Sequence, residues 1–177
     1  RQATLFPYTT LFRSPSVDKA LLEKGFHVAY YDVTHCYGNP RAVAWGTDFY
    51  NYIKNYYGLS PKVTLEGFSR GGLYALNWAA KNTDKIACIY IDAPVCDVFS
   101  WPGRKNAALW NDLLKEWNLT DEDMNSFKGN PIDNLEPLAK AGIPIISVCG
   151  DSDKTVPFKD NMDVVRSRYL ALGGPVE

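Results

Sequence analysis

Short hydrophobic runs alternate with amphipathic patterns of helical period along most of the chain. The runs have the length and the β-branched or aromatic content of strands, and the segments between them repeat hydrophobic positions at helical spacing. We predict strands at residues 26–31, 62–66, 86–91 and 143–148, and helices at residues 17–23, 41–57, 73–81 and 159–172. The alternation predicts an α/β fold, a three-layer sandwich whose sheet is mostly parallel.

Residues 98–141 interrupt this alternation. They contain short helical patterns, one at 107–117 and one that opens at Thr120 with Asp123 in the spacing of a capping box. The segment also carries Trp101, Trp110 and Trp117. We interpret it as a lid-like insertion over a ligand pocket, with Trp101 as a substrate-binding residue; packing within the lid or core is the alternative role of these rings.

The first residues fit neither pattern. Thr4 to Ser14 reads Thr-Leu-Phe-Pro-Tyr-Thr-Thr-Leu-Phe-Arg-Ser, which is one reading frame of a common sequencing-adapter oligonucleotide. We therefore interpret residues 1–14 as a non-native segment and residues 15–177 as the partial native domain, with a genuine strand and loop as the alternative. The native start is then missing, so the sequence does not decide between a cytoplasmic and a secreted or periplasmic protein.

The composition describes one globular domain with a small-molecule partner. Of the 177 residues 46% are hydrophobic, which is enough to bury one sizeable core. The formal charge of −1, without long runs of like charge, gives no reason to expect nucleic acid or an anionic membrane as a partner. No stretch approaches the roughly 20 apolar residues of a membrane span. The oligomeric state does not follow from these properties.

The cysteines do not form a metal-binding pattern. None of Cys36, Cys88, Cys96 and Cys149 lies in a Cys-x-x-Cys or Cys/His spacing. We expect them to be reduced thiols that pack as small hydrophobes, and we expect neither a metal nor a cofactor.

The strongest chemical signal is Gly-Phe-Ser-Arg-Gly at residues 67–71, which fits the pattern G-x-S-x-G. It lies between a predicted strand and a predicted helix, the context that a nucleophile elbow requires. The serine of such an elbow sits on a sharp, strained turn, and the glycines around it leave room for the strand and the helix. We therefore predict Ser69 as the nucleophile and the backbone N–H of Arg70 as an oxyanion-hole donor.

The chain resembles the α/β-hydrolase fold family from residue 15 to residue 177. Besides the elbow, the resemblance rests on Gly-Asp-Ser-Asp-Lys-Thr-Val-Pro at 150–157, which is similar to the family's acid loop, and it is closest to bacterial esterase-like members with Gly-Phe-Ser-Arg-Gly-Gly elbows. It implies that the chain covers the fourth to seventh strands of the fold, without the third strand between 26–31 and 62–66. We expect marginal folding as a result, unless residues 1–14 fill the gap.

The resemblance also implies a catalytic acid and a base. In the family, the aspartate three residues before Val-Pro completes the triad, so Asp153 is the predicted acid; Asp151 and Asp92 are alternatives. The expected chain order is serine, then acid, then histidine. His27 and His35 both precede Ser69, so neither is the expected base, and His35 is predicted to line the substrate pocket. We expect the chain as given to be inactive because it lacks this base and the second oxyanion donor.

For an intact protein, the resemblance implies hydrolysis of a carboxylic ester through an acyl-enzyme on Ser69. Amide cleavage, as in prolyl-peptidase relatives, is an alternative on the same fold. A non-catalytic α/β binding module is a third hypothesis. The Arg70 side chain is expected to pair with a carboxylate such as Glu66 or to be solvated. Recognition of an acidic substrate group by Arg70 is the alternative.

Overall fold

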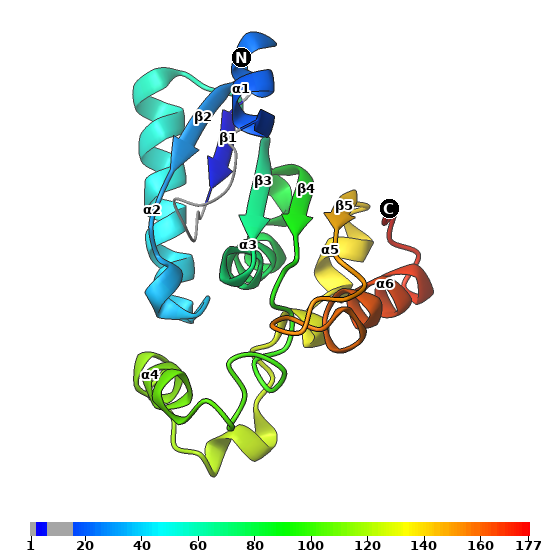
Figure 1. Cartoon of the computed structure of the whole chain (residues 1–177). Coiled ribbons are helices and arrows are strands. Elements are labelled where there is room, and N and C mark those ends of the chain that lie inside the picture. The colour runs from blue at the N-terminus through cyan, green and yellow to red at the C-terminus, as the bar shows by residue number, and fades with distance from the viewer. Residues whose placement is uncertain (1–2, 7–15) are drawn as a thin grey trace.

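Five strands form one open sheet in the computed structural model, which describes residues 3–6 and 16–177. Their order is β2-β1-β3-β4-β5, and all neighbours are parallel. The strands are β1 (Ala3–Phe6), β2 (His27–Tyr30), β3 (Val63–Phe68), β4 (Ile86–Asp92) and β5 (Ile145–Val148). Figure 1 shows them side by side, with helices packed around them. The predicted α/β class with a parallel sheet is confirmed.

β1 occupies the position where the sequence predicted a gap. Ala3 lies opposite His27 of β2 on one side and opposite Val63 of β3 on the other. A strand between two neighbours gives the facing edges of both strands hydrogen-bond partners, here along His27–Tyr30 of β2 and residues 63–65 of β3. We expected marginal folding unless residues 1–14 filled the gap between the strands at 26–31 and 62–66, and Ala3–Phe6 fills it. Residues 7–15, which follow β1, lie outside the described residues.

Helices connect the strands and follow the last of them. The described α-helices are α1 (Ser16–Glu23), α2 (Pro40–Tyr57), α3 (Arg70–Lys81), α4 (Ala107–Trp117), α5 (Glu136–Lys140) and α6 (Met162–Ala171). Short 3-10 helices are η1 (Thr34–Cys36), η2 (Thr83–Lys85), η3 (Asp123–Ser126), η4 (Pro131–Asp133) and η5 (Phe158–Asp160). No helix in these ranges is long and apolar enough to cross a membrane.

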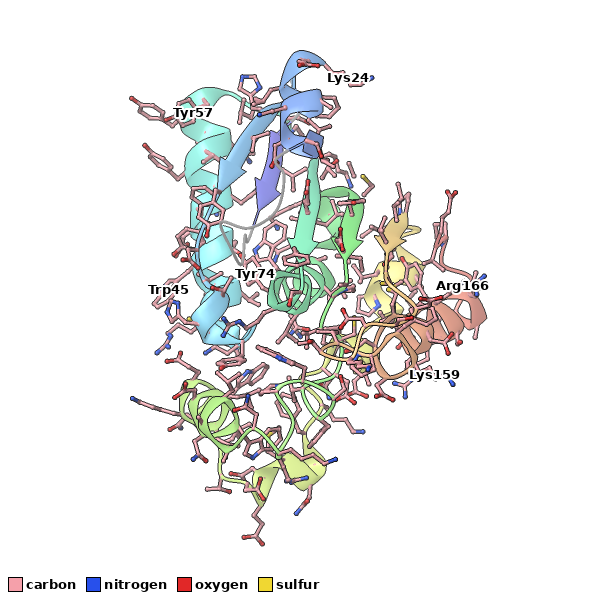
Figure 2. All side chains as sticks on the ribbon, viewed as in Figure 1. Lys24, Trp45, Tyr57, Tyr74, Lys159 and Arg166 are labelled. Atoms are coloured by element: carbon pink, nitrogen blue, oxygen red, sulfur yellow. The ribbon has the colours of Figure 1, made fainter. Side chains whose placement is uncertain are left out.

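The ends of α2 follow from local chemistry. The Asn39 side chain accepts a hydrogen bond from the N–H of Ala42 and so caps the helix, and Pro40 stands at the first helical position. Gly58 ends the helix with a left-handed φ of 62°. Along the helix, Gly46 leaves room for Tyr74 of α3, which lies between the two helices in Figure 2.

Three predicted helices differ from the observed ones, and one of them, predicted to begin at residue 73, begins at Arg70. The predicted capping-box bonds form between Thr120 and Asp123, but only the 3-10 turn η3 follows them in place of the expected helix. The last helix was predicted to begin at residue 159 and begins at Met162 instead. Asn161, at φ −121° and ψ −92°, breaks the helical path between η5 and α6.

The hydrophobic core has two parts. The larger cluster packs α2, α3, α5 and α6 against the sheet, and its fully buried side chains include Leu65, Trp78, Ile89 and Ile145. A second hydrophobic cluster consists of Tyr37, Leu73, Val95, Val98, Trp110, Leu113, Met124 and Val156. Because Leu73 belongs to α3, the second hydrophobic cluster joins the 98–141 segment to the helix that follows Ser69.

The 98–141 segment lies beyond the carboxyl ends of the strands. In Figure 1 the strand arrows point toward α4 and the yellow-green stretch that follows it. The Trp117 indole donates to the Tyr37 carbonyl at 3.0 Å, the Asn39 amide donates to the Glu116 carbonyl at 2.6 Å, and Arg41 pairs with the Glu116 carboxylate. These bonds hold α4 against the segment that links β2 to α2.

Candidate active site

Ser69 occupies a sharp turn between β3 and α3. β3 ends at Phe68 and α3 begins at Arg70, so Ser69 is the single residue between strand and helix. Its φ of 53° and ψ of −121° lie in a region that side chains with a Cβ rarely adopt. The Ser69 N–H donates to the Asp92 carbonyl at 2.9 Å, and its carbonyl accepts from the Val95 N–H at 3.0 Å. The last residue of β4 and the loop after it thus fix the strained turn through its N–H and its carbonyl.

Two glycines make this turn sterically possible. A Cβ at Gly67 would lie 2.8 Å from the Gly71 carbonyl oxygen, and one at Gly72 would lie 2.4 Å from the Pro94 Cβ. Both distances are far shorter than ordinary van der Waals contact between non-bonded heavy atoms. The predicted reason for the glycines of the elbow, a close approach of strand, helix and neighbouring loop, therefore holds in this structure.

The backbone N–H of Arg70 stands at the first position of α3. Within the described part of the chain it donates to no acceptor, as is usual for the first N–H groups of a helix. The positive end of the helix dipole adds to its ability to bind an oxyanion. The loop after β1, where the family's second oxyanion donor would lie, falls in residues 7–15 and so outside the described residues.

Asp153 lies in the loop between β5 and η5. Its Oδ1 accepts hydrogen bonds from the N–H groups of Thr155 at 2.8 Å and Val156 at 3.0 Å. Its Oδ2 accepts none from the described residues, so one carboxylate oxygen is held and the other is open. Val156 is buried in the second hydrophobic cluster together with Leu73 of α3, which anchors the Asp153 loop to the helix that starts after Ser69.

The two alternative acids occupy different environments. Asp151 is exposed, and its Oδ1 accepts from the adjacent Ser152 hydroxyl at 2.9 Å. Asp92 is buried at the end of β4, and its backbone carbonyl is the acceptor for the Ser69 N–H. Asp153, by comparison, is oriented by its own loop through two backbone hydrogen bonds.

Neither histidine is joined to this arrangement. His27 begins β2 and His35 lies in η1, and both are exposed. Among the hydrogen bonds between described residues, none connects a histidine with Ser69 or Asp153. His35, predicted to line the pocket, lies two residues before Tyr37, whose ring is part of the second hydrophobic cluster.

The Arg70 side chain differs from the expectation. It forms no ion pair with Glu66 or with any other described carboxylate. Instead its guanidinium carbon lies 5.2 Å from the centre of the Tyr37 ring and 5.4 Å from that of Trp101. Burial raises the pKa of the Tyr37 hydroxyl, and the Arg70 charge opposes that rise. Stacking on two rings replaces the expected carboxylate partner, because the loops after β2 and β4 bring both aromatics to the same guanidinium.

Sequence reasoning missed the residue that ties these loops together. Asn161 is buried, and its Oδ1 accepts from the N–H groups of Cys96 at 2.8 Å and Asp97 at 3.2 Å. Its Nδ2 donates to the Ser100 hydroxyl and the Pro157 carbonyl. One amide therefore links the Asp153 loop to the start of the 98–141 segment. An asparagine before a helix is too common a pattern to reveal such a role.

Two of the cavities lined by described residues contain neither Ser69 nor Asp153. One, of about 300 Å³, lies between α2, α3 and the 98–141 segment and is lined by Val43, Asn77 and Trp117 among others. The other, of about 380 Å³, lies within the 98–141 segment beside Asp97 and Arg104. No cluster of three or more potential metal ligands occurs in residues 3–6 and 16–177.

Comparison with known proteins identifies the class of fold. A family model described as "alpha/beta hydrolase fold" matches residues 8–136, which is most of the chain. The protein therefore belongs to the α/β-hydrolase fold family, as its elbow and acid loop predicted. Membership of this family favours a hydrolase with a small-molecule substrate. None of the curated proteins compared matches the chain significantly.

Solved structures share the fold at low sequence identity. MPT51 (FbpC1) of Mycobacterium tuberculosis superposes with a TM-score of 0.68 at 16% identity, over 99% of this chain and 79% of that one. Dipeptidyl peptidase 4 of Porphyromonas gingivalis gives a TM-score of 0.74 at 15% identity, over 99% of this chain and 27% of that one. At these identities the likeness concerns the fold, and the chain spans only part of the much longer peptidase.

Proposed function

We propose that this protein is a serine hydrolase that cleaves carboxylic esters through an acyl-enzyme on Ser69. The observation that carries the proposal is the left-handed turn at Ser69, held between β3 and α3 by two backbone hydrogen bonds and cleared by Gly67 and Gly72. Backbone strain at a single serine on a helix N-terminus is the geometry of an activated nucleophile in this fold.

The proposed reaction uses few groups of this chain. The Ser69 Oγ attacks the ester carbonyl carbon and loses its proton to a histidine, while the Arg70 N–H donates to the oxyanion that forms. The same histidine then protonates the departing alkoxide, and water hydrolyses the acyl-enzyme by the reverse sequence of proton transfers. Asp153 orients the histidine through its open Oδ2 and stabilises the imidazolium. No cofactor takes part in this scheme.

The base is proposed to lie outside the 177 residues. His27 and His35 are exposed and precede Ser69, whereas the fold expects a histidine after the acid. The proposal therefore concerns a longer form of the protein, and we expect the chain as given to hydrolyse esters poorly. Its interpretation as a partial domain preceded by a non-native 1–14 segment remains part of this proposal.

Hydrolysis of nitrophenyl esters by such a longer form tests the proposal. Ser69→Ala is expected to reduce kcat by about 10³-fold or more, and Asp153→Asn by a comparable factor, because the triad acts as a unit. Asp151→Asn is the matched control, since that carboxylate lies in the same loop, is exposed and accepts a hydrogen bond from the adjacent Ser152 hydroxyl. Full activity of Ser69→Ala, or a loss confined to Asp151→Asn, would contradict the assignment.

Amide cleavage is the competing candidate on the same scaffold. One of the similar solved structures is by name a dipeptidyl peptidase. A pair of substrates with the same acyl group, one an ester and one an anilide, separates the two activities. The ester proposal expects a much larger kcat/KM for the ester than for the anilide, and the opposite order would favour the peptidase.

A further inference from the structure

We infer that Arg70 makes this site selective for esters that carry a carboxylate. The inference rests on the proposed function, because it assigns a substrate class to the same site. Arg70 follows the proposed nucleophile directly, and its guanidinium extends along the carboxyl edge of the sheet to Tyr37, after β2, and Trp101, after β4. A positive charge is thus held beside the reacting serine.

The guanidinium is fixed in place but not neutralised. The rings of Tyr37 and Trp101 stack with their centres 6.2 Å apart, and the Arg70 guanidinium contacts both. Tyr37 is itself held by the Trp117 indole on its carbonyl. Aromatic faces orient a guanidinium and attract its charge but accept none of its hydrogen bonds in the plane. The Tyr37 hydroxyl interacts with one side of the Arg70 donor fork, and the other donors of the fork stay available for a planar anion.

A comparison within the molecule shows what is unusual about Arg70. Arg104 also lies against two rings, 5.6 Å from the centre of Phe99 and 5.2 Å from that of Trp110. Unlike Arg70, it forms an ion pair with Asp121 at 2.9 Å. Both guanidinium groups lie at similar distances from two aromatic rings. Of the two, Arg70 is the one that has no carboxylate partner among the described residues.

The environment of Arg70 favours a particular mode of binding. Its Nε is buried and has no hydrogen-bond partner, so a ligand approaches the outer edge formed by the two Nη atoms. Two parallel N–H···O bonds to a carboxylate fit that edge. Asp112 and Glu116 on α4 contribute negative charge near Tyr37, but Glu116 pairs with Arg41 and neither forms an ion pair with Arg70. The ion-pair partner of Arg70 is then a carboxylate of the substrate.

Ligand titration of the 177-residue chain tests this without requiring catalysis. Monomethyl succinate carries an ester and a carboxylate, and dimethyl succinate is its neutral counterpart. Binding is followed by NMR through the indole N–H signal of Trp101, assigned with Trp101→Phe. We expect saturable binding of the monoester, at least about tenfold tighter than that of the diester, and a similar loss in Arg70→Met. Arg104→Met, the matched control, should bind like the original protein.

The outcomes separate this inference from the proposed function. Equal binding of the two esters, no saturable binding of the monoester, or unchanged binding by Arg70→Met would overturn the role of Arg70. If Arg70→Met does not fold, the comparison of the two ligands on the original protein still decides. Failure of Ser69 to react in the longer form, together with carboxylate binding at Arg70, would instead reject the hydrolase and leave an anion-binding site.

Discussion

Ser69 shows how one residue depends on the absence of side chains around it. The turn that exposes it needs a left-handed φ, and the helix behind it approaches Pro94 so closely that only glycine fits at position 72. The motif was visible in the sequence because these steric demands leave a spaced pattern of glycines. The loop after β4 that completes the contact left no such pattern, since Pro94 resembles any proline at a strand end.

Gly72→Ala is expected to destabilise the protein. The added Cβ would lie 2.4 Å from the Pro94 Cβ and 2.9 Å from its Cα, so backbone must move to make room. Overpacking of this kind lowers the free energy of unfolding by about 1–3 kcal/mol. Chemical denaturation measures the change. Gly150→Ala is the control, because nothing lies within 4 Å of its added Cβ, and equal stabilities for the two variants would refute the close contact.

Asp97 gives a pH-dependent prediction. Its pKa is raised, first by burial and then, against an opposing hydrogen bond from Phe99, by the charges of Asp133 and Asp160. A raised folded-state pKa means that ionisation costs stability, which is lost as the pH rises from about the unfolded value of 3.8 through the folded one. At neutral pH, Asp97→Asn should therefore raise Tm, since its amide oxygen can still accept from Phe99.

The gain should disappear in acid. Below the unfolded pKa both states of the original protein bind the proton, and the two proteins should then unfold at similar temperatures. Thermal unfolding at neutral pH and near pH 3 measures this. Asp48→Asn, which changes an exposed carboxylate on α2, is the control. A constant difference in Tm across the pH range would show that burial of the charge is not the cause.

At the level of elements, periodicity predicted most of the framework. The predicted helix at 41–57 and strand at 86–91 match α2 and β4 to within a residue at each end, because Gly58, Pro40 and a continuous apolar run mark their limits. The start of α6 was misplaced, since its limit depends on the conformation of Asn161 and on long-range bonds to Cys96 and Asp97. Such contacts have no local signal.

Asn161 should be the most sensitive of the polar residues that join elements. Asn161→Ala leaves the buried N–H of Cys96 without an acceptor and detaches the Asp153 loop from Ser100. We expect a loss of about 2 kcal/mol in the free energy of unfolding, measured by urea titration. Asn111→Ala, on the exposed side of α4, should change it by no more than about 0.5 kcal/mol. Similar effects of both variants would contradict the linking role.

At the scale of the whole molecule, the family was predictable from the sequence, whereas a strand between β2 and β3 was expected only on the condition that residues 1–14 supply it. The elbow and the acid loop each combine a strand end with fixed residue spacing, and both lie at the carboxyl edge as expected. The strand at Ala3–Phe6 pairs with β2 and β3 through its backbone, and such pairing depends little on side-chain identity. A segment interpreted as non-native therefore fills the position between β2 and β3.

The 98–141 segment is a further property of the whole molecule. It packs on α3 through the second hydrophobic cluster, and its Trp117 indole donates to the Tyr37 carbonyl. The segment therefore contacts both the helix that begins at Arg70 and the loop that carries Tyr37, whose ring lies against the Arg70 guanidinium. The segment could be identified from the sequence because it interrupts the alternation of strand and helix patterns. The aromatic contacts with Arg70 could not be predicted, because they join loops after two different strands.

The central claim is that Ser69 is an activated nucleophile, and the most direct measurement is mass spectrometry of the protein after reaction with a fluorophosphonate. The sample is a longer form that includes a histidine after the acid loop, compared with its Ser69→Ala variant. We predict one adduct per molecule, located on Ser69 by peptide mapping, and none in the variant. A folded, histidine-containing protein that remains unmodified, or an adduct that persists in Ser69→Ala, would contradict it.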